Sequence, residues 1–144
     1  MNETSTRWVL GHKITVHPIS GDYDIVTVET PPHVPGPPPH LHHNYREAFI
    51  VIEGEMEFVV NGETKIVKAG ESLEIPPNTV HTFNNKSDQP CKWVDIHNPK
   101  GFLDFFDTIG IPIEEENAQE RSVEPEIIQK VIATAASFDM RIEM

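Results

Sequence analysis

A succession of short strand-like segments, separated by turn signals, limits the folds open to this chain. In residues 55–60 acidic and apolar side chains alternate, a period of two that is typical of a strand with one buried face. The dipeptide Asn61-Gly62 follows at once and predicts a two-residue hairpin, because both central positions of the favoured turn need a positive φ. Regularly spaced short strands of this kind indicate an all-β sandwich or barrel. Eight strands are predicted in all: residues 13–17, 24–30, 47–53, 55–60, 63–68, 72–75, 79–84 and 91–97.

The C-terminal third of the chain has a different character. Residues 102–108 are predicted to form a short helix that ends at Gly110, because their apolar side chains fall on one face. Residues 113–122 are acidic and polar and are expected to be an exposed connection. Pro125 stands where helices commonly begin, and an amphipathic helix over residues 125–137 is predicted. Its apolar stripe is expected to pack across the sheet or against a second subunit, and consists of Ile127, Ile128, Val131, Ile132 and Ala135.

Length and charge argue against several classes of function. A chain of 144 residues is long enough for one domain with its own core, and the single cysteine, Cys91, allows no intrachain disulfide, which suits a reducing cytoplasm. The first residues lack the basic and apolar regions of a secretory signal, and no apolar run is long enough to span a bilayer. A net charge of −12 disfavours nucleic acids and anionic membranes. We therefore expect a cytoplasmic protein whose partner is a small molecule.

Three histidines and one glutamate in two short segments form a candidate metal site: His40, His42, Glu47 and His81. His40 and His42 are two residues apart, so on an extended chain both imidazoles point to the same face. Glu47 follows at an odd spacing, so the chain must turn between His42 and Glu47. His81 begins a later strand, directly after a proline-rich turn. Imidazole and carboxylate suit a divalent transition metal and leave positions open for substrate or water.

A proline-rich segment precedes the first ligand. Residues 30–40 hold six of the thirteen prolines. Such a segment can be an extended ligand for a proline-recognition module, but inside a small domain it is more often a stiff loop. A stiff loop would present His40 with little backbone freedom left to lose, which would pre-organise the metal site.

These two segments resemble the two motifs of the cupin superfamily. The first motif is a glycine, H-x-H, three or four residues, a glutamate, six residues and a glycine. In this chain it reads Gly36, His40, His42, Glu47 and Gly54. The second motif is a glycine, five residues, Pro-x-Gly, two residues, a histidine, three residues and an asparagine. In this chain it reads Gly70, Pro76, Asn78, His81 and Asn85. Gly36 lies closer to His40 than the first motif asks, and Asn78 replaces a glycine of the second.

The resemblance covers about residues 12–98 and looks closest to small quercetin-dioxygenase-like members. It implies a jelly-roll barrel or β-sandwich over about residues 12–98, a C-terminal helical extension over about residues 101–144, and often a homodimer. Residues 1–144 would then form a single domain. It also implies one divalent metal ion, which is iron, manganese, nickel, copper or zinc in different members.

Three functions remain open on these grounds. The leading prediction is a metal-dependent dioxygenase acting on a small aromatic or enol-type substrate, with Glu47 as both metal ligand and catalytic base. The alternatives are a non-redox isomerase, lyase or decarboxylase that uses the metal as a Lewis acid, and a non-catalytic module that binds a small ligand or a metal. The predicted substrate pocket consists of Phe49, Met56, Phe58, Phe83, Trp93 and Tyr45. The remaining histidines without motif support are expected to be structural, and are His12, His17, His33 and His97.

Overall fold

The fold is known from a computed structural model, which describes residues 4–143. Twelve strands and short helical segments follow one another along the chain. In order they are β1 (Ser5–Val9), β2 (His12–His17), β3 (Asp24–Thr30), β4 (His40–Leu41), β5 (Arg46–Glu53), β6 (Glu55–Val60), β7 (Glu63–Lys68), β8 (Ser72–Ile75), β9 (His81–Asn84), β10 (Cys91–Asn98), α1 (Leu103–Ile109), β11 (Ile111–Pro112), α2 (Ala118–Arg121), α3 (Pro125–Thr134), the 3-10 turn η1 (Ala135–Phe138) and β12 (Arg141–Ile142).

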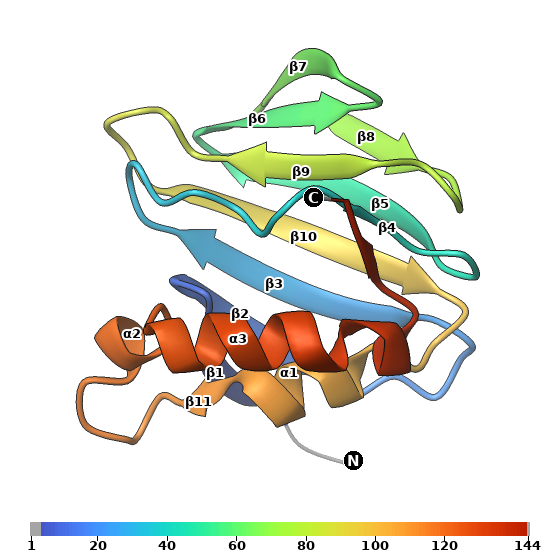
Figure 1. Cartoon of the computed structure of the whole chain (residues 1–144). Coiled ribbons are helices and arrows are strands. Elements are labelled where there is room, and N and C mark those ends of the chain that lie inside the picture. Colours follow the sequence, from blue (N-terminus) through green and yellow to red (C-terminus); the bar gives the residue numbers. More distant parts are fainter. Residues whose placement is uncertain (1–3, 144) are drawn as a thin grey trace.

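The strands form two antiparallel sheets that pack against each other (Figure 1). The seven-stranded sheet has the order β11-β1-β2-β3-β10-β5-β8, and the five-stranded sheet has the order β12-β4-β9-β6-β7. Phe49 of β5 and Phe58 of β6 meet in the core between the sheets, with ring centroids 4.9 Å apart. The predicted all-β sandwich with a C-terminal helical segment is confirmed.

The eight predicted strands are all present, and four of them have the bounds expected, namely β3, β6, β7 and β8. In β3 and β10 every second residue is buried. Asn61 and Gly62 both have positive φ, 51° and 80°, as the hairpin between β6 and β7 requires. The chain also bends between His42 and Glu47, since β4 ends at Leu41 and β5 begins at Arg46.

Four strands were not predicted: β1, β4, β11 and β12. The side chains of β1 are mostly half-buried, so no alternation of apolar and polar residues marks it. The other three have two residues each and exist only because a neighbour pairs with them, as β12 pairs with β4. A pattern within one segment carries no information about such pairings.

The helices lie close to their predicted places and cover one end of the sandwich (Figure 1). Helix α1 begins one residue later than predicted, and Gly110 caps it by donating its N–H to the carbonyl oxygen of Phe106 over 2.8 Å. Pro125 lies in the first turn of α3, and the 3-10 turn η1 takes over at Ala135. No helix within residues 4–143 has the length and hydropathy of a membrane span.

The prediction of an exposed connection over residues 113–122 is wrong at its C-terminal end. Ala118, the first residue of α2, is buried, and so is Ser122, which directly follows that helix. The hydroxyl of Ser122 accepts a hydrogen bond from the backbone N–H of Gly11 over 2.9 Å. This contact ties the connection to the turn between β1 and β2, because it satisfies a buried backbone donor.

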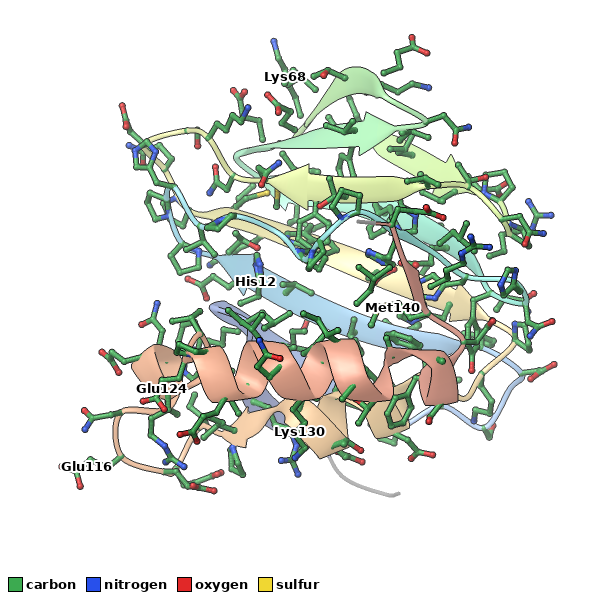
Figure 2. All side chains as sticks on the ribbon, in the orientation of Figure 1. His12, Lys68, Glu116, Glu124, Lys130 and Met140 are labelled. Atoms are coloured by element: carbon green, nitrogen blue, oxygen red, sulfur yellow. The ribbon has the colours of Figure 1, made fainter. Side chains whose placement is uncertain are left out.

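The apolar stripe of α3 is divided between core and surface. Val131 and Ala135 are buried in the core, whereas Ile128 and Ile132 are each 40% exposed. Figure 2 shows Met140 between α3 and the sheets. Glu116 and Glu124 lie near the N-terminal end of α3, at the left of the view. Ile52 on the outer face of the seven-stranded sheet is 55% exposed. The homodimer expected from the sequence stays a prediction. The exposed apolar side chains are surface that a second subunit could cover.

Candidate metal centre and cavity

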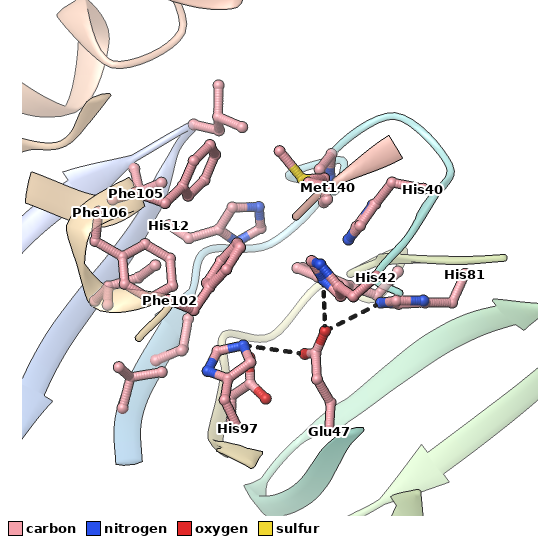
Figure 3. Close-up of a pocket in the computed structure, with 18 of the residues that line it drawn as sticks. His12, His40, His42, Glu47, His81, His97, Phe102, Phe105, Phe106 and Met140 are labelled. Carbon is pink, nitrogen blue, oxygen red and sulfur yellow. Dashed lines mark ion pairs between the residues drawn. The ribbon is translucent and has the colours of Figure 1, made fainter. Parts of the chain in front are cut away.

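Both sheets contribute to the candidate metal centre. His40 of β4 and His81 of β9 are direct partners in the register of the five-stranded sheet, and His42 follows two residues after His40. Glu47 lies on β5 in the opposite sheet and reaches across to them. The structure thus brings together the four predicted ligand residues, and all four are buried. Figure 3 shows Glu47 between His97 on one side and His42 and His81 on the other.

The donor atoms lie at distances suited to a shared cation. Oε1 of Glu47 is 2.9 Å from Nε2 of His42 and 3.4 Å from Nε2 of His81. The His40 ring lies beside them, with its centroid 4.4 Å from that of His81 and 5.1 Å from that of His42. Two ligands that are each about 2.1 Å from one metal ion lie about 3.0–3.4 Å apart. The side chains therefore need little adjustment to coordinate a single ion.

Backbone carbonyl groups select the tautomer of all three imidazoles. Nδ1 of His40 lies 2.9 Å from the carbonyl oxygen of Pro38, and Nδ1 of His81 lies 2.9 Å from that of Thr79. Nδ1 of His42 lies 2.7 Å from the carbonyl oxygen of Asp139. A carbonyl oxygen only accepts, so each Nδ1 must carry the proton and donate it. In a neutral imidazole Nε2 is then left with its lone pair free for a metal ion.

This arrangement fits a divalent cation better than it fits an empty site. With its Nδ1 proton donated to Asp139, a neutral His42 would present a lone pair to the Glu47 carboxylate at 2.9 Å. Two acceptors at that distance repel each other unless a proton or a metal cation lies between them. Three imidazole nitrogens and one carboxylate are a donor set suited to zinc, iron, manganese, nickel or copper.

The electrostatics of the site keep the ligands in metal-binding form. Burial, with the neighbouring His81 and His42, lowers the pKa of His40 to about 3, so its imidazole is neutral at pH 7. Burial alone would raise the pKa of Glu47, but the adjacent His97 and the close contacts with the ring nitrogens of His42 and His81 outweigh it and hold that pKa well below its usual range. Neutral histidines and an ionised carboxylate are the forms that bind metal.

Asp95 and His97 on β10 extend the site, and sequence reasoning missed them. Nε2 of His97 is 3.4 Å from Oε2 of Glu47 and 3.5 Å from Oδ2 of Asp95. Burial and the charge of Glu47 raise the pKa of Asp95 well above its ordinary value. Oδ1 of Asp95 and Nδ1 of His97 have no hydrogen-bond partner within residues 4–143. The assignment of a purely structural role to His97 does not fit this geometry.

A signal for both residues was present in the sequence. Asp95 and His97 are two and four residues beyond Trp93, and side chains at that spacing share one face of a strand. Because Trp93 is predicted to face the pocket, Asp95 and His97 should face it too.

A cavity of about 80 Å³ adjoins the four candidate ligands. Three of the predicted pocket residues line it, namely Phe49, Phe83 and Trp93. Met56 and Phe58 do not line it, although both are fully buried in the core. Tyr45 is also absent from the lining and packs behind the site, 5.9 Å from the His42 ring and 5.6 Å from the Phe102 ring between centroids.

The far wall of the cavity comes from the C-terminal third of the chain. Phe102, Phe105 and Phe106 of the α1 region line it together with Val131 of α3 and Met140 (Figure 3). Phe102 also packs against the His97 ring, with centroids 4.9 Å apart. The helical extension therefore closes the end of the sandwich over the candidate metal centre, and makes the cavity mostly apolar.

His12 is a buried histidine with a structural hydrogen-bond chain. Trp93 Nε1 donates to Thr30 Oγ1 over 2.9 Å, and Thr30 Oγ1 lies 2.9 Å from Nδ1 of His12. Nε2 of His12 donates to the carbonyl oxygen of Pro35 over 3.1 Å. Both ring nitrogens of His12 have a hydrogen-bond partner when the ring is neutral, and burial lowers its pKa to about 4 despite the hydrogen bond to Pro35.

The low pKa of His12 predicts acid sensitivity. The unfolded chain takes up a proton near pH 6.5 and the folded chain only near pH 4, so stability falls as pH falls through that window. We expect His12 to account for a loss of about 2 kcal/mol in the unfolding free energy of the metal-free protein between pH 7 and pH 5. Urea unfolding of wild type and His12→Gln at both pH values measures it. Equal losses in the two proteins would contradict the prediction.

Comparisons with known proteins agree with this architecture. The family profile described as the Cupin domain matches residues 26–97, which include all four candidate ligands. The chain is 35% identical to quercetin 2,3-dioxygenase of Bacillus subtilis (strain 168) over 75 residues, 52% of this chain and 22% of that protein. It is 32% identical to H2HPP isomerase of Bacillus subtilis over 101 residues, 62% of this chain and 42% of that protein.

The solved structures resemble the chain in fold. A RmlC-like cupin from Shewanella frigidimarina NCIMB 400 superposes with a TM-score of 0.61 at 22% identity, over 72% of this chain and 89% of that one. The chain spans less than half the length of the two curated relatives named above, so their whole activities do not transfer with the match. The profile match spans half of the chain and includes strands of both sheets and the candidate metal centre. The chain therefore belongs to the Cupin domain family.

Proposed function

We propose that the chain binds one divalent transition metal ion through His40, His42, Glu47 and His81, and that it acts on a small organic substrate in the adjoining cavity. The observation that carries this proposal is the orientation of three imidazoles whose Nδ1 atoms are held by backbone carbonyls, so that their Nε2 atoms face Glu47 or the space beside it. A metal ligand needs one ring nitrogen without a proton, and a hydrogen bond that holds the proton on the other nitrogen provides this.

The leading activity is that of a metal-dependent dioxygenase. The metal would supply Lewis-acid and redox chemistry where the four ligands meet. Glu47 has two distinct oxygen environments, since Oε1 faces His42 and His81 while Oε2 faces His97. It can therefore hold the metal through one oxygen and accept a proton from a substrate hydroxyl through the other. The likeness to quercetin 2,3-dioxygenase supports this assignment.

The cavity favours a small aromatic or enol-type substrate. Its walls are mainly aromatic and aliphatic, so a flat apolar body would be desolvated there while its oxygen atoms face the ligand cluster. At about 80 Å³ it is smaller than the roughly 300–1,000 Å³ of pockets that hold drug-sized ligands. A catechol or a short diketone is therefore a better match than a flavonol, which would require Met140 and α3 to move.

A non-redox isomerase, lyase or decarboxylase is the second candidate, and a specific observation favours it. Asp95 and His97 lie beside Glu47 in a buried group, so one side of the cavity offers several groups that can exchange protons. Such groups can move a proton between neighbouring substrate atoms. The likeness to H2HPP isomerase points the same way. A non-catalytic module that binds a small ligand or metal is the third candidate.

The location and assembly of the protein are proposals as well. A single free cysteine, Cys91, suits the reducing cytoplasm. We also propose a homodimer, because Ile52, Ile128 and Ile132 are exposed apolar side chains that a second subunit could cover.

The test combines metal analysis with two assays. Protein purified without chelator is expected to contain about one equivalent of iron, manganese, nickel, copper or zinc per chain. The reconstituted protein is then mixed with catechols, short diketones and flavonols, and oxygen uptake is recorded. Parallel anaerobic samples are followed by NMR in deuterated water for isomerisation or proton exchange.

Each outcome separates the candidates. Oxygen uptake that depends on metal and on a small enol or catechol supports the dioxygenase. Redox-inert zinc with no oxygen uptake excludes it, and anaerobic exchange or isomerisation then supports the second candidate. Binding without turnover in either assay supports the third. Protein that takes up no metal overturns the whole proposal.

A further inference from the structure

The C-terminal segment after η1 contacts the metal-ligand strand at several points. β12 pairs with β4 in the register Arg141 with Leu41 and Ile142 with His40. The backbone N–H of Glu143 donates to the carbonyl oxygen of Pro39 over 2.8 Å. Figure 1 shows this segment running from the helical extension back to the edge of the five-stranded sheet. Strand β4 therefore has β9 on one side and the C-terminal segment on the other.

Asp139 is the centre of these contacts. Its carbonyl oxygen accepts the Nδ1–H of His42 over 2.7 Å. Its carboxylate accepts two backbone N–H groups from the turn after His42, that of His43 over 3.1 Å and that of Asn44 over 2.7 Å. A left-handed backbone at Asp139, with φ of 52° and ψ of 46°, lets one residue present its carbonyl and its carboxylate to the same turn.

We propose that Asp139 is a positioning residue of the metal centre, and that the segment from Asp139 to Glu143 clamps His40 and His42 in metal-binding geometry. This inference rests on the metal binding proposed above. The two carboxylate contacts hold the turn after His42, and the carbonyl contact orients its ring. Hydrogen bonds that orient metal ligands typically contribute about 10- to 100-fold to metal affinity.

Strand β4 depends on the clamp because its own pairing with β9 is short. β4 has only two residues, and its register with β9 consists of the single pair His40 and His81. So little pairing leaves the strand and the turn after it dependent on their other contacts. The family profile ends at residue 97, so the clamp lies outside the matched region.

The test uses Asp139→Gly, because glycine keeps the left-handed backbone and removes only the carboxylate. The dissociation constant for Co(II) is measured by competition with a chromogenic chelator, and the visible absorption of bound Co(II) reports the ligand geometry. We expect an affinity about 10- to 100-fold weaker than wild type and a changed Co(II) spectrum. Asp139→Asn keeps one acceptor oxygen and is expected to fall between the two.

Asn117→Gly is the matched control, since Asn117 also has a left-handed backbone, with φ of 56°, but lies at the start of α2. Circular dichroism and thermal unfolding show whether each variant is folded. A folded Asp139→Gly protein with wild-type affinity and spectrum overturns the inference, even if its melting temperature falls. If Asp139→Gly does not fold, the same criterion applies to Asp139→Asn. Wild type that binds no Co(II) refutes the proposed metal site itself.

Discussion

Replacement of His81 by alanine is expected to weaken binding of a divalent transition metal by a factor of about 100 or more. His81 contributes one of the three imidazoles, and its Nε2 lies 3.4 Å from Glu47 Oε1. Without it the ion loses one of four protein ligands, and the His40 ring loses the neighbouring ring whose centroid lies 4.4 Å away. Metal content of the purified variant, followed by competition with a chelator, measures the effect.

His17→Ala is the control for this variant. His17 lies on β2, and its Nε2 contacts the hydroxyl of Thr27 over 3.0 Å, away from the four candidate ligands. This protein should bind metal as wild type does, whereas His81→Ala should be folded by circular dichroism but largely metal-free. Full metal occupancy in His81→Ala would refute the ligand assignment.

Replacement of Gly36 by alanine is expected to lower the free energy of unfolding by about 3 kcal/mol or more. A Cβ atom at Gly36 would lie 1.8 Å from the carbonyl oxygen of Phe83 and 2.9 Å from its carbonyl carbon. These are backbone atoms of β9, so a change of rotamer cannot relieve the clash. The proline-rich loop would have to move away from β9, and three consecutive prolines would carry that shift toward His40.

Two measurements test this prediction. Urea unfolding of the metal-free protein gives the loss of stability, and metal competition reports whether His40 has moved, with an expected loss of about tenfold or more. Gly62→Ala is the control, because no atom lies within 4 Å of the added Cβ and only its φ of 80° opposes alanine. That change should cost about 1–2 kcal/mol and leave metal binding intact. Equal losses of stability and of metal affinity in Gly36→Ala and Gly62→Ala would contradict the prediction, because they would mean that the loop accommodates the added Cβ.

Most of the fold could be predicted because a strand with one buried face has alternating apolar and polar residues in its sequence. In β3 and β10 alternate residues are buried, and the same alternation marks both strands in the sequence. β4 and β12 could not be predicted, because each has two residues and depends on a partner about a hundred positions away. Ser122 was misjudged for the same reason, since its burial depends on the distant Gly11.

The candidate site was predictable in its ligands but not in its surroundings. Strand parity placed Phe49, Phe58 and Phe83 on inward faces, and the structure agrees. Parity does not give the position along the barrel, so Phe49 and Phe83 line the cavity while Phe58 is buried in the core without lining it. His97 could have been found by the same parity, whereas no pattern around Asp139 pointed to a contact with His42.

By itself the sequence determined the sandwich, the hairpin at Asn61-Gly62 and the four side chains that suit a metal ion, because these depend on local backbone preference, side-chain direction and donor chemistry. Only the tertiary structure decided that Glu47 also contacts His97, that α1 and α3 close the cavity, and that Asp139 holds His42. Those contacts join residues from different elements, and packing of the whole chain, rather than any local pattern, sets their distances.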